Sequence, residues 1–231
     1  MQRLRDEIKL ETTYDSNAIE GSMLTLRETV LVVKEGVDHI PGKPIRDVLA
    51  AKGFAAGFDA IFPFVEDRIP LTFSLISEFH KYVMLGALPE FCGVFRNHSV
   101  QILGTRCRTA QFWEIPERIQ ELVDRYNTSD KTLHLIEKAA HFHAAFETIH
   151  PFHDGNGRTG RLLLNYMLVR EGFWPGKIES VITTPWLRTT KPTTRTSSHA
   201  SSRKEPRNNS NTASKSPGNR KQHNGCVNPR E

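Results

Sequence analysis

Apolar side chains recur at spacings of three and four along most of the chain, which is the period of an amphipathic α-helix. In residues 133–149 they surround most of the circumference, so we expect that helix to be central and buried. Gly172 is expected to end the last helix. The helices that the pattern predicts cover about residues 24–33, 46–62, 71–85, 116–126, 133–149 and 158–170. The sequence therefore predicts an all-α fold.

One segment departs from the helical period. Val100 and Ile102 flank a polar residue, Gly104 lies in the connection that follows, and a second extended stretch covers 106–112. Alternation of apolar and polar residues around a glycine is typical of two short paired strands. We therefore expect a small β-hairpin at about 98–112.

The end of the chain has a different composition. Residues 186–231 are rich in Ser, Thr, Asn and Pro and hold ten of the 31 basic residues but two of the 26 acidic ones. This segment therefore carries a net charge of +8, and the part before it −3. With almost no large apolar side chain, it cannot offset the entropic cost of ordering. We divide the chain into an N-terminal segment (1–35), a core domain (36–182) and a disordered basic tail (183–231).

Composition also narrows the expected compartment and partners. No stretch approaches the roughly 18 to 20 uninterrupted apolar residues of a membrane span, and the start of the chain is charged. Cys92, Cys107 and Cys226 are scattered, which argues against a disulfide framework or a thiolate zinc site. We expect a cytoplasmic protein without a membrane partner. The composition disfavours nucleic acid as a partner, because only the tail is basic.

Candidate chemistry is concentrated in residues 150–161, a polar turn between two predicted buried helices. Gly155 and Gly157 permit positive φ angles that direct N–H groups toward one point, at the positive end of the following helix. A phosphate is expected to bind there. Asp154 lies beside this turn and is a hard oxygen ligand suited to Mg²⁺.

Two arginines and a histidine accompany the turn. Arg158 and Arg161 are three residues apart, so both project from the first helical turn and suit phosphate recognition. His150 ends the preceding helix, and a neutral imidazole there can deprotonate an attacking hydroxyl. Phe152 is expected to anchor the loop, and His143 is interpreted as structural. The combination points to polyphosphate chemistry.

Residues 150–161 resemble the signature of the Fic family, His-x-Phe-x-Asp/Glu-Gly-Asn-Gly-Arg-x-x-Arg, and meet every defined position. The resemblance implies a helical Fic core that transfers AMP from Mg-ATP to a Ser, Thr or Tyr hydroxyl of a target protein, the chain itself included among the candidates. It implies His150 as the general base and Asp154 as the Mg²⁺ ligand. Relatives that phosphorylate their target tend to have Lys where this chain has Gly157, so Gly157 favours nucleotide transfer. The residues implied to hold ATP and its metal are Asp154, Gly155, Asn156, Gly157, Arg158, Thr159, Gly160 and Arg161.

A second motif lies near the N-terminus. The run from Ser16 to Gly21 resembles the family's inhibitory sequence, Ser/Thr-x-x-x-Glu-Gly/Asn. Glu20, on a helix, would pair with Arg161 where that arginine should hold the γ-phosphate of ATP. Ser16, one turn earlier, would help to fix the pair. The resemblance thus implies autoinhibition by Glu20.

Two further segments are interpreted through the resemblance. The hairpin corresponds to the family's flap, which docks a target segment by β-strand addition, here with Val100, Ile102 and Gly104. The preceding run from Gly93 to Arg96 resembles the family's Gly-x-aromatic-Arg. After 172–175, relatives continue into a helix that helps to close the nucleotide pocket, and no such helix is readable in this sequence.

Other functions stay open. Glu20 could instead align a water molecule for removal of AMP from a modified protein, and a chain without the last helix could bind nucleotide without turnover. A basic nucleic-acid binder is the fourth interpretation and depends on the tail alone. The sequence is also compatible with a homodimer.

Overall fold

The fold is helical, as the apolar pattern predicts. The structure is a computed structural model that describes residues 2–87, 89–101, 108–128 and 133–176, and no strand occurs within these ranges. Two short segments are 3-10 helices, η1 and η2. The elements are α1 (Gln2–Ile19), α2 (Leu26–Lys34), α3 (Ile45–Glu66), α4 (Phe73–Val83), η1 (Pro89–Phe91), η2 (Phe112–Glu114), α5 (Ile115–Thr128), α6 (Leu135–Ile149) and α7 (Asn156–Arg170).

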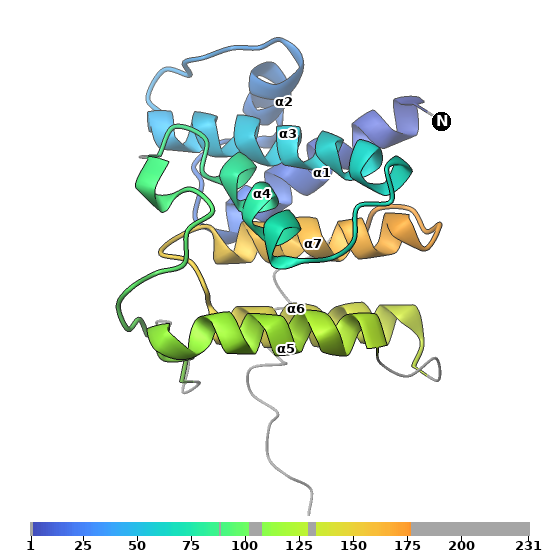
Figure 1. Ribbon diagram of the computed structural model, residues 1–231. Coiled ribbons are helices and arrows are strands. Elements are labelled where there is room, and N and C mark those ends of the chain that lie inside the picture. Colours follow the sequence, from blue (N-terminus) through green and yellow to red (C-terminus); the bar gives the residue numbers. More distant parts are fainter. Residues whose placement is uncertain (1, 88, 102–107, 129–132, 177–231) are drawn as a thin grey trace, which may run out of the picture. The chain divides into compact units, whose positions relative to one another are not determined.

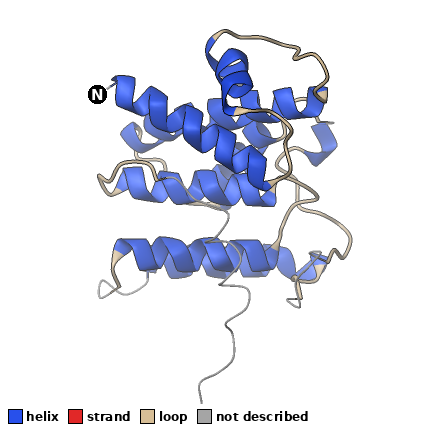
Figure 2. Cartoon of the chain, turned by 180° about the vertical axis from the view of Figure 1, so that it is seen from behind, coloured by secondary structure: helices blue, strands red, loops and turns tan. Residues whose placement is uncertain are grey.

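The helix α7 lies between two groups of helices (Figure 1). It contacts α6 on one side and α1, α3 and α4 on the other, while α5 packs on α6; the view from behind shows the same order (Figure 2). Being covered on both sides, α7 buries Leu162, Leu163, Tyr166 and Met167 completely. It also buries polar residues, and the largest cluster of these lies in its first two turns: Asn156, Arg158, Thr159 and Arg161. This buried polar end of α7 is where the candidate site forms.

The helix α1 shows why the apolar pattern did not predict its first part. Its buried residues are mostly polar: Leu10, Thr12, Thr13, Ser16 and Asn17. A helix with this composition has no apolar stripe to detect. Its N-terminal half is also held to α3 by charge, since Lys9 Nζ lies 2.9 Å from Asp59 Oδ2 and the Arg5 guanidinium lies over the Phe62 ring.

Local capping explains where several predicted boundaries shift. The helix α4 begins at Phe73 because Thr72 is its N-cap and accepts a hydrogen bond from Leu75 N. The helix α2 begins at Leu26 for a similar reason, since Thr25 and Glu28 form a capping box. Such caps are one-residue features that periodicity cannot resolve.

The predicted hairpin is not observed as β-structure in the described residues. Ile102 and Gly104 lie outside them, and Val100 is coil. Side chains, and not a ladder of backbone hydrogen bonds, join the two described sides of this segment. Thr109 Oγ1 donates to the Val100 carbonyl, and Ser99 Oγ donates to Gln111 Oε1 at 2.9 Å.

The C-terminal end of α7 follows the prediction. Gly172 has a φ of 83°, and its neighbour Phe173 donates its N–H to the Leu168 carbonyl at 3.0 Å, which closes the helix. Gly176 N then donates to Asn165 Oδ1 at 2.7 Å. The predicted tail, 183–231, lies outside the described residues.

The long helix α3 is apolar enough, by length and composition alone, to cross a membrane, and half of that stretch is buried inside the domain. It contacts α1, α2, α4 and α7. A core helix covered on several sides has this composition for the same physical reason as a membrane span does.

Candidate active site

His150 forms the end of α6 in a strained backbone conformation. It is the C-cap, with φ 53° and ψ 61°, and its N–H donates to the Phe146 carbonyl at 2.9 Å. A histidine adopts this left-handed region only where its surroundings enforce it, at a cost of roughly 1–2 kcal/mol. The strain turns the chain from α6 into the loop that precedes α7.

Burial lowers the pKa of His150 below its usual value, and the positive charge of Arg96 acts in the same direction. The Glu147 carbonyl and the carboxylates of Glu20 and Asp154 oppose this shift. His150 is therefore neutral at physiological pH. A neutral imidazole is the form that can accept a proton.

Of the two glycines expected to allow a positive φ before α7, Gly155 has one, whereas Gly157 lies inside the helix and does not. Gly155 is the N-cap of α7 with φ 73°, and an added Cβ there would lie 2.9 Å from Val83 Cγ1. The Asn156 side chain closes the loop, since its Oδ1 accepts from Phe152 N at 2.8 Å and its Nδ2 donates to the Phe152 carbonyl at 2.9 Å. The first N–H groups of a helix have no partner inside the helix, so this end of α7 can bind an anion.

Beneath the loop lies His80, a residue that the sequence analysis missed. Its Nδ1 accepts from Gly93 N at 2.8 Å, so its Nε2 carries the proton and donates to the Asp154 carbonyl at 2.9 Å. Its ring stacks on Phe152 with centroids 3.7 Å apart, and burial lowers its pKa to about 4. His80 therefore supports the loop as a neutral donor, while the fully buried Phe152 anchors it as expected.

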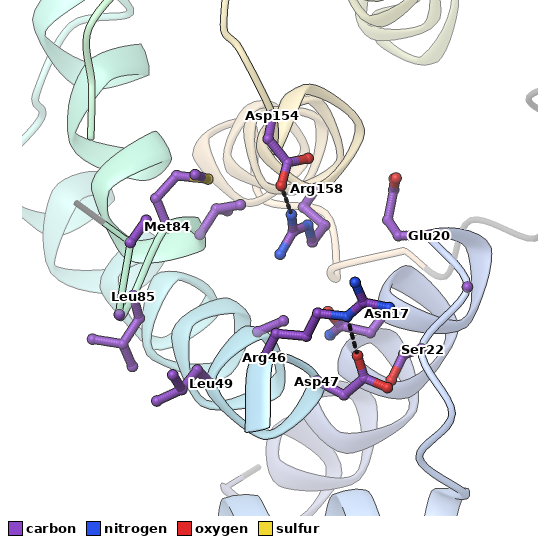
Figure 3. A pocket seen from close by; sticks show the side chains of 15 residues that line it. Asn17, Glu20, Ser22, Arg46, Asp47, Leu49, Met84, Leu85, Asp154 and Arg158 are labelled. Atoms are coloured by element: carbon purple, nitrogen blue, oxygen red, sulfur yellow. Dashed lines mark hydrogen bonds and ion pairs between the residues drawn. The ribbon is translucent and has the colours of Figure 1, made fainter. Parts of the chain in front are cut away.

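Asp154 and Arg158 lie on a pocket of about 360 Å³. Asp154 Oδ1 accepts from Gly155 N at 2.6 Å, and its Oδ2 lies 3.4 Å from Arg158 Nη2. Figure 3 shows these polar side chains, with Glu20, on a different side of the pocket from the apolar Leu49, Met84 and Leu85. The volume is within the range of small-molecule sites.

Asp154 is the residue of this site that would hold a magnesium ion. The Asp154 side chain is 65% exposed, which leaves its oxygens accessible from the pocket. Across the described ranges, no group of three His, Cys, Asp or Glu residues could hold a metal ion alone. Mg²⁺ commonly uses one or two carboxylates and takes its other ligands from phosphate and water.

Arg161 is held by the N-terminal helix. It is 3% exposed; its Nε donates to Ser16 Oγ at 2.8 Å and its Nη2 to the Ser16 carbonyl at 3.0 Å. The same Nη2 donates to Glu20 Oε1 at 2.6 Å. The structure thus brings together Ser16, Glu20 and Arg161, which the resemblance predicted to meet. Glu20 and Arg161 are 141 positions apart in the sequence.

Glu20 lies one residue beyond α1, and not inside a helix as predicted. The helix ends in a Schellman motif, in which Gly21 N donates to the Ala18 carbonyl and Ser22 N to the Asn17 carbonyl, each at 3.0 Å. Gly21 has a φ of 84°, which glycine and asparagine adopt most readily. The glycine of the motif therefore sets the position from which the glutamate reaches Arg161.

Two glycines of α7 are needed because other side chains occupy their surroundings. A Cβ at Gly157 would lie 2.3 Å from Glu20 Oε1, so the docked carboxylate requires a residue without a side chain. A Cβ at Gly160 would lie 2.6 Å from Glu147 Oε1 and 2.9 Å from His143 Nδ1. Gly160 is therefore a packing residue between α6 and α7, as is the fully buried Thr159.

Two titratable residues of α6 lie behind Arg161. Burial raises the pKa of Glu147 to about 7, although Arg161 opposes the shift. Burial also lowers the pKa of His143 to about 4, and Arg161 acts in the same direction. Glu147 was not singled out from the sequence, since a glutamate on a helix is ordinarily exposed.

The fold and the site define a helical domain in which a neutral histidine ends α6 and a partly polar pocket lies at the start of α7. A crystal structure of a Fic domain containing signaling protein from Bacteroides thetaiotaomicron matches with a TM-score of 0.73 and 31% identity, covering 81% of this chain and 72% of that one. A fragment of Fic-1 from Caenorhabditis elegans matches with a TM-score of 0.63 and 31% identity, covering 75% and 52%. Residues 70–168 match the Fic/DOC family. The chain belongs to the Fic/DOC family.

Curated proteins of the same family are also similar. The chain is 33% identical over 182 residues to protein adenylyltransferase fic-1 of Caenorhabditis elegans, covering 76% of this chain and 34% of that protein. It is 32% identical over 185 residues to protein adenylyltransferase Fic of Nematostella vectensis, covering 76% and 41%. The chain thus spans between 34% and 41% of the length of these two relatives.

Proposed function

We propose that the chain is a protein adenylyltransferase, which transfers AMP from ATP to a Ser, Thr or Tyr hydroxyl of a target protein. The observation that carries the proposal is the geometry at the junction of α6 and α7. A neutral histidine ends one helix, and six residues later an anion-binding helix N-terminus begins, with Asp154 and Arg158 on a shared pocket. The names of the curated relatives support the same activity.

In the proposed reaction, the target oxygen forms a bond to the α-phosphorus of ATP. The bond from that phosphorus to the oxygen bridging to the β-phosphate breaks, and pyrophosphate leaves with the electron pair. His150 accepts the proton of the attacking hydroxyl, which its lowered pKa permits at neutral pH. The atoms and charges therefore balance without a further reactant.

The other residues of the site bind and orient the nucleotide. The N–H groups at the start of α7 bind phosphate oxygens, and Arg158 adds a charged donor. Asp154 would hold Mg²⁺, and the ion when bound neutralises charge on the phosphates. Arg161 would bind the γ-phosphate once it is free of Glu20.

We further propose that Glu20 inhibits the transfer. Its carboxylate occupies Arg161 Nη2 at 2.6 Å, so the γ-phosphate loses a bidentate partner and the α-phosphate is not aligned with the target hydroxyl. The Ser16 contacts hold the same guanidinium in this arrangement. A target segment would dock along the proposed flap at about 98–112, through Val100, Ile102 and Gly104.

A second candidate activity is removal of AMP from a modified protein. The observation that favours it is the position of Glu20, which lines the pocket with a side chain that is 39% exposed and therefore accessible to a water molecule. The two activities respond in opposite directions to Glu20→Gly: transfer increases, and hydrolysis is lost.

The proposal is tested by incubating the Glu20→Gly protein with ATP, Mg²⁺ and a cell lysate, followed by mass spectrometry of modified peptides. AMP adducts on Ser, Thr or Tyr are expected, and their yield should fall at least a hundredfold in Glu20→Gly/His150→Asn, by the usual contribution of a general base. Asparagine is the matched replacement because it tolerates the left-handed backbone at this position. Adducts at equal yield in both proteins would refute the role of His150, and a Glu20→Gly protein that binds ATP but forms no adduct would refute the proposed activity.

A further inference from the structure

Arg96 is a buried arginine, and each of its three guanidinium nitrogens donates to a backbone carbonyl oxygen. It is 4% exposed. Its Nε donates to the His150 carbonyl at 2.7 Å, and its Nη2 also lies 3.3 Å from the Ile149 carbonyl. Its Nη1 donates to the His98 carbonyl at 2.6 Å, and the same Nη2 to the Ala110 carbonyl at 2.6 Å. One planar group therefore joins three separate parts of the backbone.

The backbone of Arg96 is attached to the same turn. Its N–H donates to the Pro151 carbonyl at 3.0 Å, which directly follows His150. The preceding Phe95 ring packs near the Phe152 ring, with centroids 5.9 Å apart. The segment that enters the flap is thus fixed to the loop that carries the catalytic histidine.

The acceptors of Arg96 are significant because of where they lie in the chain. His98 and Ala110 stand at the two ends of the segment proposed to dock a target, and His150 is the proposed base. Burial lowers the pKa of Arg96, as expected for a cation removed from water, and the four carbonyls supply the hydrogen bonds that offset this cost. A guanidinium presents five N–H donors in one fixed plane, and lysine has no equivalent arrangement.

We infer that Arg96 is a positioning residue that fixes the backbone of His98 and Ala110, on the two described sides of the proposed docking segment, relative to the backbone of His150. The inference rests on the proposed function, because it assigns the guanidinium the task of setting the distance between the docked hydroxyl and the base. It concerns the target side of the reaction alone. Arg96 does not line the pocket that holds Asp154, Arg158 and Glu20, so the inference assigns it no contact with the nucleotide.

The test compares Glu20→Gly with Glu20→Gly/Arg96→Lys. Lysine keeps the positive charge but cannot reach all four carbonyls in one plane. Arg118→Lys in the same background is the control, because Arg118 lies on α5 with a side chain that is 52% exposed. Three quantities are measured for each protein: labelling of lysate proteins with ATP, the Kd of α,β-methylene-ATP with Mg²⁺, and the melting temperature.

We expect Arg96→Lys to lower the labelling rate at least tenfold, by the usual contribution of a hydrogen bond from a charged group, while the Kd of the ATP analogue stays within twofold. Arg118→Lys should change neither. Labelling at the parent rate would overturn the inference, and so would a loss of analogue binding in parallel with labelling, because a general structural role produces that result. If Glu20→Gly itself binds the analogue but labels nothing, the proposed function fails, and the role of Arg96 fails with it.

Discussion

Replacing Glu20 by glycine is expected to raise the transfer rate, because it removes the carboxylate that occupies Arg161. The contact is a charge-assisted hydrogen bond of 2.6 Å, and such bonds contribute about 1.5–3 kcal/mol. Arg161 is almost fully buried, but the Glu20 side chain is 39% exposed, so solvent screening places the contribution near the lower end, about 1.5 kcal/mol. Since about 1.4 kcal/mol corresponds to a factor of ten, we expect an increase of roughly tenfold or more.

Replacing Ser16 by alanine is expected to raise the transfer rate as well, but by less than Glu20→Gly. The hydroxyl of Ser16 accepts from Arg161 Nε, and its carbonyl remains available after Ser16→Ala. That substitution therefore removes one of three contacts to the guanidinium. The expected order of rates is Glu20→Gly, then Ser16→Ala, then the wild type.

The assay is the initial rate of protein labelling from ATP labelled at the α-phosphate, at equal protein and Mg²⁺ concentrations. Glu35→Gly is the matched control, because Glu35 is the C-cap of α2 and precedes Gly36 with φ 72°, as Glu20 precedes Gly21 at the end of α1. The control should leave the rate unchanged. Equal rates for Glu20→Gly and the wild type, or an equal increase in the control, would refute inhibition by Glu20.

Three further substitutions test other parts of the account. Gly157→Ala should displace Glu20, because the added Cβ would lie 2.3 Å from Glu20 Oε1, but the labelling rate should rise less than in Glu20→Gly, because the same atom would lie 3.0 Å from Arg161 Nη1; a further increase on combining the two substitutions would contradict this explanation. Glu147→Gln should remove a pH dependence of the free energy of unfolding. In the folded wild type the pKa of Glu147 is about 7, above the ordinary 4.5, so the protonated carboxyl stabilises the fold at low pH. The wild type should therefore lose stability as pH rises from 4.5 through 7, on the order of 2–3 kcal/mol by pH 8. Urea unfolding at pH 5 and pH 8 measures this, and the same loss in both proteins would refute it. Asp154→Asn keeps an acceptor for Gly155 N but removes the charge, so the Mg²⁺ concentration that gives half-maximal labelling should rise at least tenfold; an unchanged Mg²⁺ dependence would exclude Asp154 as the metal ligand.

The part of the site that the sequence predicts is the part that is contiguous in the chain. His150, Asp154 and Arg158 lie within nine positions, so they fall at one junction between two helices, where Asp154 and Arg158 line the same pocket. The pairing of Glu20 with Arg161 was also expected, although only through the resemblance to a family. No periodicity along the chain relates two residues that are 141 positions apart.

The residues that were missed act through the backbone or through burial. His80 was missed, and Arg96 was noted only as part of a run that resembles the family; both donate to carbonyl oxygens of the loop and its neighbours, and carbonyl oxygens carry no sequence signal. Glu147 is unusual only because α7 covers it at Gly160, which becomes apparent when the helices are packed. The polar buried face of α1 was missed for the related reason that its contacts are hydrogen bonds and not an apolar stripe.

The most direct measurement of the central claim uses two samples of ATP, one labelled at the α-phosphate and one at the γ-phosphate, with the Glu20→Gly protein and a lysate. Transfer of AMP predicts that proteins acquire label from the α-phosphate sample alone, and that His150→Asn abolishes it. Label from the γ-phosphate sample would instead indicate phosphorylation and would contradict the account.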